Sequence, residues 1–166
     1  MEYLFKRALS YEEKKIKPFI INAENQSPDV YIILKDGNDV SRIDLYTGEG
    51  AGLYQKLIKV NDWIVIGCSY HVIWISKNYC DMKKFKFDNF SYFMDLTVIG
   101  DFIIGVFGDR LIKFDKSANI IWNSIVSIDG IFINQINENI IYCSCEMDPP
   151  GGWIDKKIDL NSGLEL

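Results

Sequence analysis

Residues 62–67 read Asp62-Trp63-Ile64-Val65-Ile66-Gly67, a polar residue followed by an apolar run of the kind that forms a strand buried on both faces. The same pattern begins at Asp29, Asp101 and Asn139, so it occurs four times along the chain. Successive starting points are 33, 39 and 38 residues apart. The chain is therefore built from four repeats of similar length.

A period near forty residues, built from short strands, is typical of propeller blades. A candidate strand precedes each apolar run and an alternating run follows it, as in blades of four antiparallel strands. The sequence predicts an all-β fold, a four-repeat β-propeller-like domain of antiparallel sheets. The alternative is an open, twisted β-sandwich or stack made from the same hairpins. In either case we expect equivalent units whose inner strands bury Ile32, Val65, Ile103 and Ile141.

We expect a single domain, residues 1–166, because no linker or change of composition divides the chain. Its units span approximately residues 19–53, 54–91, 92–130 and 131–166. The last unit has few residues left for an outer strand, and residues 3–9 offer a strand that could close it. Residues 10–17 have the capping-box pattern of a short helix, although a turn or loop is favoured there.

Two repeats end in similar motifs, Arg42-Ile43-Asp44-Leu45-Tyr46-Thr47-Gly48-Glu49 and Lys157-Ile158-Asp159-Leu160-Asn161-Ser162-Gly163. This pattern resembles blades of pyrroloquinoline-quinone-type and WD-like propeller repeats, over roughly residues 27–166. The chain lacks the Gly-His and Trp-Asp pairs of WD repeats and has too few blades for a quinone enzyme, so the resemblance implies no cofactor. In size and composition the chain also resembles small bacterial immunity proteins, which implies a toxin as partner.

The net charge of −5 makes a phosphate backbone a poor partner, so we expect no nucleic acid. The N-terminus does not have the pattern of a secretory signal. The longest uncharged run, residues 63–76, is too short to span a bilayer. We therefore expect a cytoplasmic protein that does not bind a membrane.

No catalytic motif stands out, so we expect neither an enzyme nor a cofactor or metal site. The four cysteines are expected to be reduced, and Cys143 and Cys145 should lie on one strand face as small buried hydrophobes. Cys68 and His71 stand too close in sequence to form a known nucleophile motif. His71 is expected to be a polar residue in a turn.

The fourth repeat is interrupted by an insertion of about six residues between its two inner strands. Such an insertion maps to a loop, often on a binding face, and Pro149-Pro150 should stiffen it. We expect a partner-binding loop in which Trp153 is an apolar anchor and Glu146 and Asp148 meet cationic groups. The alternative is a rigid hairpin turn whose Trp folds back onto the sheet.

These features favour a non-catalytic protein-binding domain. The most specific hypothesis is a bacterial immunity protein that neutralises a cognate toxin, which would be a basic, nuclease-type protein because the chain is acidic. The alternative is a small-ligand or glycan-binding module that uses the central face of a propeller. The oligomeric state stays open.

Overall fold

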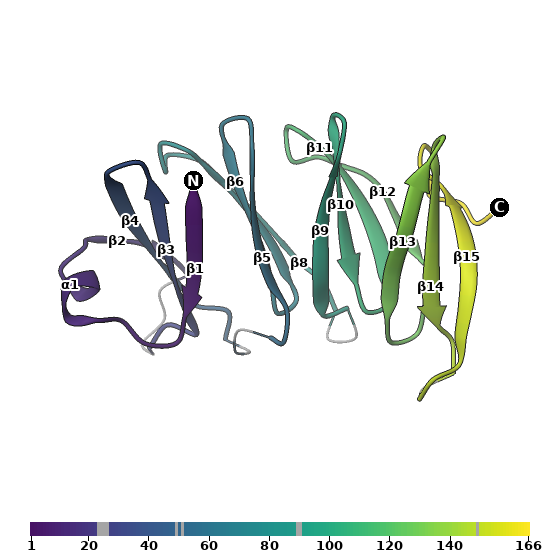
Figure 1. Cartoon of the computed structure of the whole chain (residues 1–166), viewed down its shortest axis with the longest axis horizontal. Helices are drawn as coiled ribbons and strands as arrows, with labels where there is room; N and C mark the ends of the chain where they lie inside the picture. Colours follow the sequence, from purple (N-terminus) through teal and green to yellow (C-terminus); the bar gives the residue numbers. More distant parts are fainter. Residues whose placement is uncertain (23–26, 49, 51, 89–90, 149) are drawn as a thin grey trace.

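The chain forms an all-β structure in which four sheets stand side by side in an open row (Figure 1). This computed structural model describes all residues except 23–26, 49, 51, 89–90 and 149. The first sheet and the last sheet lie at opposite ends of the row. The all-β class is confirmed, whereas a propeller is not, because the sheets do not close into a ring.

Each sheet has its central strands from one predicted repeat. The first sheet, in the order β1-β3-β4-β2, contains β1 (Glu2–Lys6), β2 (Pro18–Ile21), β3 (Val30–Asp36) and β4 (Asp39–Leu45). The second contains β5 (Gln55–Val60), β6 (Trp63–Cys68), β7 (His71–Ser76) and β8 (Met82–Lys86) in sequence order. The third contains β9 (Phe93–Ile99), β10 (Phe102–Phe107), β11 (Arg110–Asp115) and β12 (Ile120–Ile125), and the fourth β13 (Ile131–Asn137), β14 (Ile140–Glu146) and β15 (Trp153–Asp159).

The polar residue that opens each of the last three repeats belongs to a two-residue hairpin turn. These turns are 61–62, 100–101 and 138–139, each between the first two strands of its sheet. Asn61 has a φ of 53°, Gly100 of 54° and Asn139 of 70°. Positive φ values of this kind are favoured by Gly and Asn and match the twist of the flanking strands. The repeat seen in the sequence is therefore a repeat of turns as well as of apolar strands.

The first sheet is assembled differently from the others. Of residues 3–9, which could have closed the last unit, residues 3–6 instead lie in β1, which pairs antiparallel with β3. The strand that precedes β3 in sequence, β2, pairs in parallel with β4 at the other edge. Because the row is open, the last unit lies too far from the N-terminus to use this strand. The outer edge of β15 instead pairs with the C-terminal residues, through the isolated bridge between Ile158 and Glu165.

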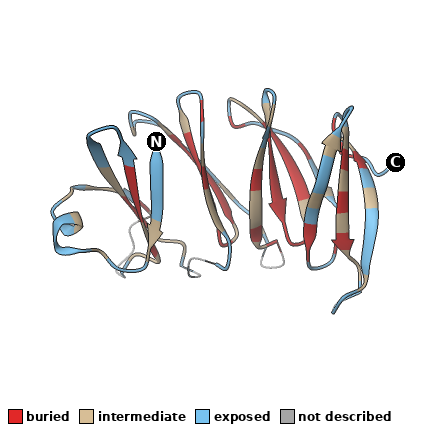
Figure 2. Ribbon diagram, viewed as in Figure 1, coloured by how far each residue is buried: buried red, intermediate tan, exposed pale blue. Residues whose placement is uncertain are grey.

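The hydrophobic cores lie between successive sheets. One cluster joins the first and second sheets, another the second and third, and a further one the third and fourth. The predicted burial of the inner strands is confirmed: Ile32, Val65, Ile103 and Ile141 lie on β3, β6, β10 and β14, and each is 0% exposed. These residues are not equivalent in direction, because Val65 and Ile103 both belong to the core between the second and third sheets. Figure 2 shows how the buried residues follow these strands through the row.

The outer face of the first sheet is covered by the segment that contains the short helix α1 (Tyr11–Lys14) (Figure 1). Arg42 on β4 lies 2.6 Å from the carboxylate of Asp44 and donates to the carbonyl oxygens of residues 13, 14 and 16. The capping box between Ser10 and Glu13 is present. Hydrogen bonds from Lys6 and Ser10 lower the pKa of Glu13 to about 2. Beneath this segment Ile33 is buried.

The described part of the chain contains no helix that is long and apolar enough to cross a membrane.

Two isoleucines of the third sheet test the packing between sheets. Ile103 is 0% exposed and Ile125 is 71% exposed. Ile103→Ala should lower the free energy of unfolding by about 2–5 kcal/mol because it leaves a cavity in a closed core. Ile125→Ala, the control, should change it by less than about 0.5 kcal/mol. Urea denaturation of both variants measures the difference, and equal losses would contradict this packing.

Candidate interaction site

The loop between β14 and β15 interrupts the regular pattern of hairpins. The corresponding turns in the other sheets contain only two residues, namely 37–38, 69–70 and 108–109. Residues 147–152 separate β14 from β15, which confirms the position of the insertion. The loop projects beyond the end of the last sheet (Figure 1). The stiffening expected from Pro149 concerns a residue outside the described part of the chain.

The three predicted contact residues lie at the base of this loop and within it. Glu146 and Trp153 are opposite each other as the final pair of β14 and β15, and Asp148 is exposed in the loop. The Oε1 atom of Glu146 accepts a hydrogen bond of 2.7 Å from the N–H of Gly151. The N–H of Gly152 donates to the carbonyl oxygen of Asp148 at 2.9 Å. Glu146 thus holds the loop through its side chain and is not free of internal contacts.

Trp153 both packs onto the sheet and stays accessible. Its ring lies 5.2 Å from that of Phe132 on β13, between centroids, and passes over Gly130. A Cβ added at Gly130 would come within 2.8 Å of the indole, so any larger residue there would displace the ring. Trp153 is nevertheless 42% exposed and Phe132 is 53% exposed. The indole therefore folds back, as the alternative expected, while keeping a large free surface.

Trp153 belongs to a wider surface, the outer face of the last sheet. Residues of β14 alternate, and Ile141, Cys143 and Cys145 point into the core shared with the third sheet. The residues between and after them, Tyr142, Ser144 and Glu146, point away from that core, as do the residues that pair with these three on β13 and β15. We call this surface the terminal face and define it by Phe132, Tyr142, Glu146, Trp153, Asp155 and Lys157.

Side chains on the terminal face contact one another. The ammonium of Lys157 lies 5.7 Å from the centroid of the Tyr142 ring. The hydroxyl of Ser144 donates to Asp155 at 2.7 Å and accepts from the amide of Asn134 at 2.8 Å. The face therefore combines aromatic rings with an ordered polar network. The sequence reasoning missed the roles of Phe132 and Tyr142, which depend on the register of β13 with β14.

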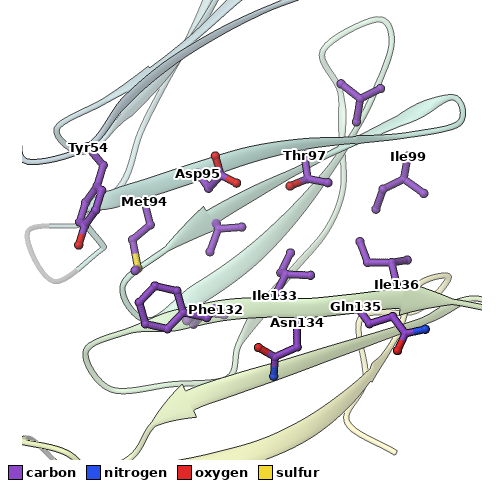
Figure 3. A pocket seen from close by; sticks show the side chains of 13 residues that line it. Tyr54, Met94, Asp95, Thr97, Ile99, Phe132, Ile133, Asn134, Gln135 and Ile136 are labelled. Carbon is purple, nitrogen blue, oxygen red and sulfur yellow. The ribbon is translucent and has the colours of Figure 1, made fainter.

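A groove of about 660 Å³ separates β9 of the third sheet from β13 of the fourth. Apolar side chains, including Met94, Ile133 and Ile136, line it. Figure 3 shows Met94 and Phe132 beside Tyr54 at one end of the groove. Polar residues line its two sides, Asp95 and Thr97 on β9 and Asn134 and Gln135 on β13. Asp95 is also 2.7 Å from the ammonium of Lys56.

The thiols and the histidine lie mostly inside the structure. Burial raises the pKa of Cys68 to about 12, so this thiol is not a ready nucleophile beside His71. His71 begins β7 and is 1% exposed, so the expected polar turn residue is instead buried. Cys143 and Cys145 face the same core with their sulfur atoms 3.6 Å apart. Their hydrogen bond and burial raise the pKa of Cys143.

Among the described residues, no three His, Cys, Asp or Glu side chains form a group suited to a metal ion. Comparison with protein-family models and with curated proteins finds no match for this chain.

The four thiols should differ sharply in reactivity. All are free, but only Cys80 is exposed. In the native protein, a thiol-specific disulfide reagent should react rapidly with one cysteine, and in denaturant without reductant it should react with four, because burial blocks the other three. Cys80→Ser should remove the rapid reaction. Fewer than four reactive thiols after unfolding would contradict the reduced state.

Proposed function

We propose that this chain is a non-catalytic protein-binding domain that contacts its partner through Glu146, Asp148 and Trp153. Trp153 would be the apolar anchor, Asp148 would meet a cationic group, and Glu146 would both hold the loop and present negative charge. The observation that carries this proposal is the exposed pair of Trp153 and Phe132 beside an ordered acidic loop. Interfaces are enriched in such aromatic residues, which often dominate the binding energy.

In its most specific form, the proposal is a cytoplasmic bacterial immunity protein that neutralises a cognate toxin. The acidic balance of the chain would favour association with a basic, nuclease-type toxin. A binding role needs a rigid surface and no catalytic group, which suits a stack of sheets in which three of the four thiols are buried. The propeller-like character of the repeats belongs to the same proposal and is supported by the sequential strand order of the last three sheets.

The test of this function uses the protein encoded beside this chain's gene. The two proteins should form a complex, and this chain should suppress the toxicity of its neighbour. Trp153→Ala should weaken the complex by about 2 kcal/mol or more, or roughly thirtyfold. It should lower the free energy of unfolding by only about 1–2 kcal/mol, because the indole is partly exposed.

Tyr11→Ala is a matched control, because Tyr11 is an aromatic residue that is 75% exposed at the opposite end of the row. Calorimetric titration should show unchanged affinity for this variant. A neighbouring protein that binds Trp153→Ala as tightly as the natural chain would contradict the assigned site.

The groove between β9 and β13 favours one second candidate, a small-ligand or glycan-binding function. Exposed rings at Tyr54 and Phe132 can stack on a sugar, while Asp95 and Asn134 offer complementary hydrogen-bonding groups. This site lies between two sheets and is not the central channel of a closed propeller.

A glycan array separates this second candidate from the first. A binding glycan should lose at least about tenfold in affinity with Phe132→Ala, since it would lose a stacking surface, and should be insensitive to Asp148→Lys in the loop. Absence of any glycan bound by the natural chain on the array would argue against the groove as a sugar site.

A further inference from the structure

The two ends of the row differ in a way that the repeats do not require. At the first sheet, residues 7–17 cover the outer face and bury Ile33, and Arg42 fastens this cover through three carbonyl oxygens. At the last sheet, no described segment covers the terminal face in this way, and most residues of β15 are exposed (Figure 2).

We propose that the whole terminal face, and not the loop alone, is the docking surface for a basic protein. This inference rests on the proposed protein-binding function.

The composition of the face is that of an interface and not of an ordinary solvated sheet. Phe132 and Trp153 together expose aromatic surface, and Tyr142 lies on the same face. The polar groups around them are already ordered, since Ser144 links Asp155 to Asn134. A partner would therefore meet apolar rings in a fixed polar frame, with little side-chain entropy left to lose.

Charge decides which occupant fits. The unit 131–166 contains six acidic and two basic residues, a net charge of −4, whereas the whole chain has −5. Residues 1–53, which form the first sheet, carry a net charge of −2, and the units 54–91 and 92–130 carry +3 and −2. The uncovered last sheet is therefore the most acidic of the four. Two copies packed through this face would bring like charges together, which is unfavourable. A surface rich in Lys and Arg is the complementary occupant, and its cationic side chains can also stack on Trp153.

The size of the face indicates how the partner must lie. Three strands of seven residues present a projected area of roughly 24 by 14 Å, or about 340 Å². A stable interface buries about 800 Å² on each partner. The partner must therefore extend beyond the face, and the β14–β15 loop, which contains the exposed Asp148, is the adjoining projection. The face and the loop together make one continuous surface.

Lysozyme, a basic globular protein, is a suitable probe of this surface. Added to the isotopically labelled chain at low salt, it should shift amide resonances of β13, β14, β15 and their loop, and leave the first sheet unchanged. Salt at about 0.5 M should abolish the shifts by screening. Shifts spread over all four sheets, or confined to the groove at β9, would overturn the proposal.

Two pairs of charge reversals supply the quantitative test. Asp148→Lys with Asp155→Lys alters the terminal face and loop, whereas Glu2→Lys with Asp39→Lys alters exposed acids of the first sheet by the same net charge. The first pair should weaken lysozyme binding at least about tenfold and the second less than about threefold. Equal losses would show that net charge alone drives binding and would overturn the assignment to this face.

A separate measurement tests whether a second copy of this chain occupies the terminal face. Sedimentation of the natural chain should show no dimer that the Asp148 and Asp155 reversals change, and a dimer that they abolish or strengthen would overturn the choice of partner. If lysozyme binds to this face but the protein encoded by the adjacent gene does not bind the chain, the docking surface is supported and the immunity function is contradicted. If the protein encoded by the adjacent gene binds with an affinity that the Asp148 and Asp155 reversals do not change, the immunity function is supported and the docking surface is contradicted.

Discussion

Burial of both faces of the sheets is the constraint on which the rest of this structure depends. Within the row, β6 sends Ile64 and Ile66 toward the first sheet and Val65 toward the third. The third sheet does the same with β10, where Ile103 and Ile104 belong to different cores. Such strands must be apolar throughout, which is why the repeats read as continuous apolar runs and not as simple alternation.

The sequence predicts the contents of each sheet better than the arrangement of the sheets. Period and turn chemistry are local, so the units and their buried central strands follow from them. Whether successive sheets form a ring or a row depends on contacts between residues far apart in sequence. Gly67 illustrates this, since a Cβ there would lie 2.1 Å from the ring of Phe93. No local pattern shows that a glycine in β6 sets how closely β9 approaches.

The candidate site divides in the same way. Trp153, Glu146 and Asp148 stand out because the insertion breaks the period. Phe132 does not stand out, because its face depends on a bulge. The register of β13 shifts between Ile133 and Gln135, so Ile133 and Ile136 face the same core although they are three positions apart. A strict alternation of two would put them on opposite faces. The irregular spacing of these isoleucines is the one signal in the sequence that marks the bulge.

The terminal face is held rigidly by its attachment to the third sheet. The carbonyl oxygen of Leu160, just after β15, accepts hydrogen bonds of 3.0 Å from both the ammonium of Lys113 and the indole N–H of Trp122. Lys113 is only 3% exposed and lies over the ring of Phe102, and burial lowers its pKa. A buried cation with this carbonyl as acceptor is costly to detach, since separation would leave its charge without that partner. These contacts oppose movement of the last sheet relative to its neighbour. A partner that docks on the outer face of the last sheet meets a preorganised surface. Binding then needs little free energy to order this surface.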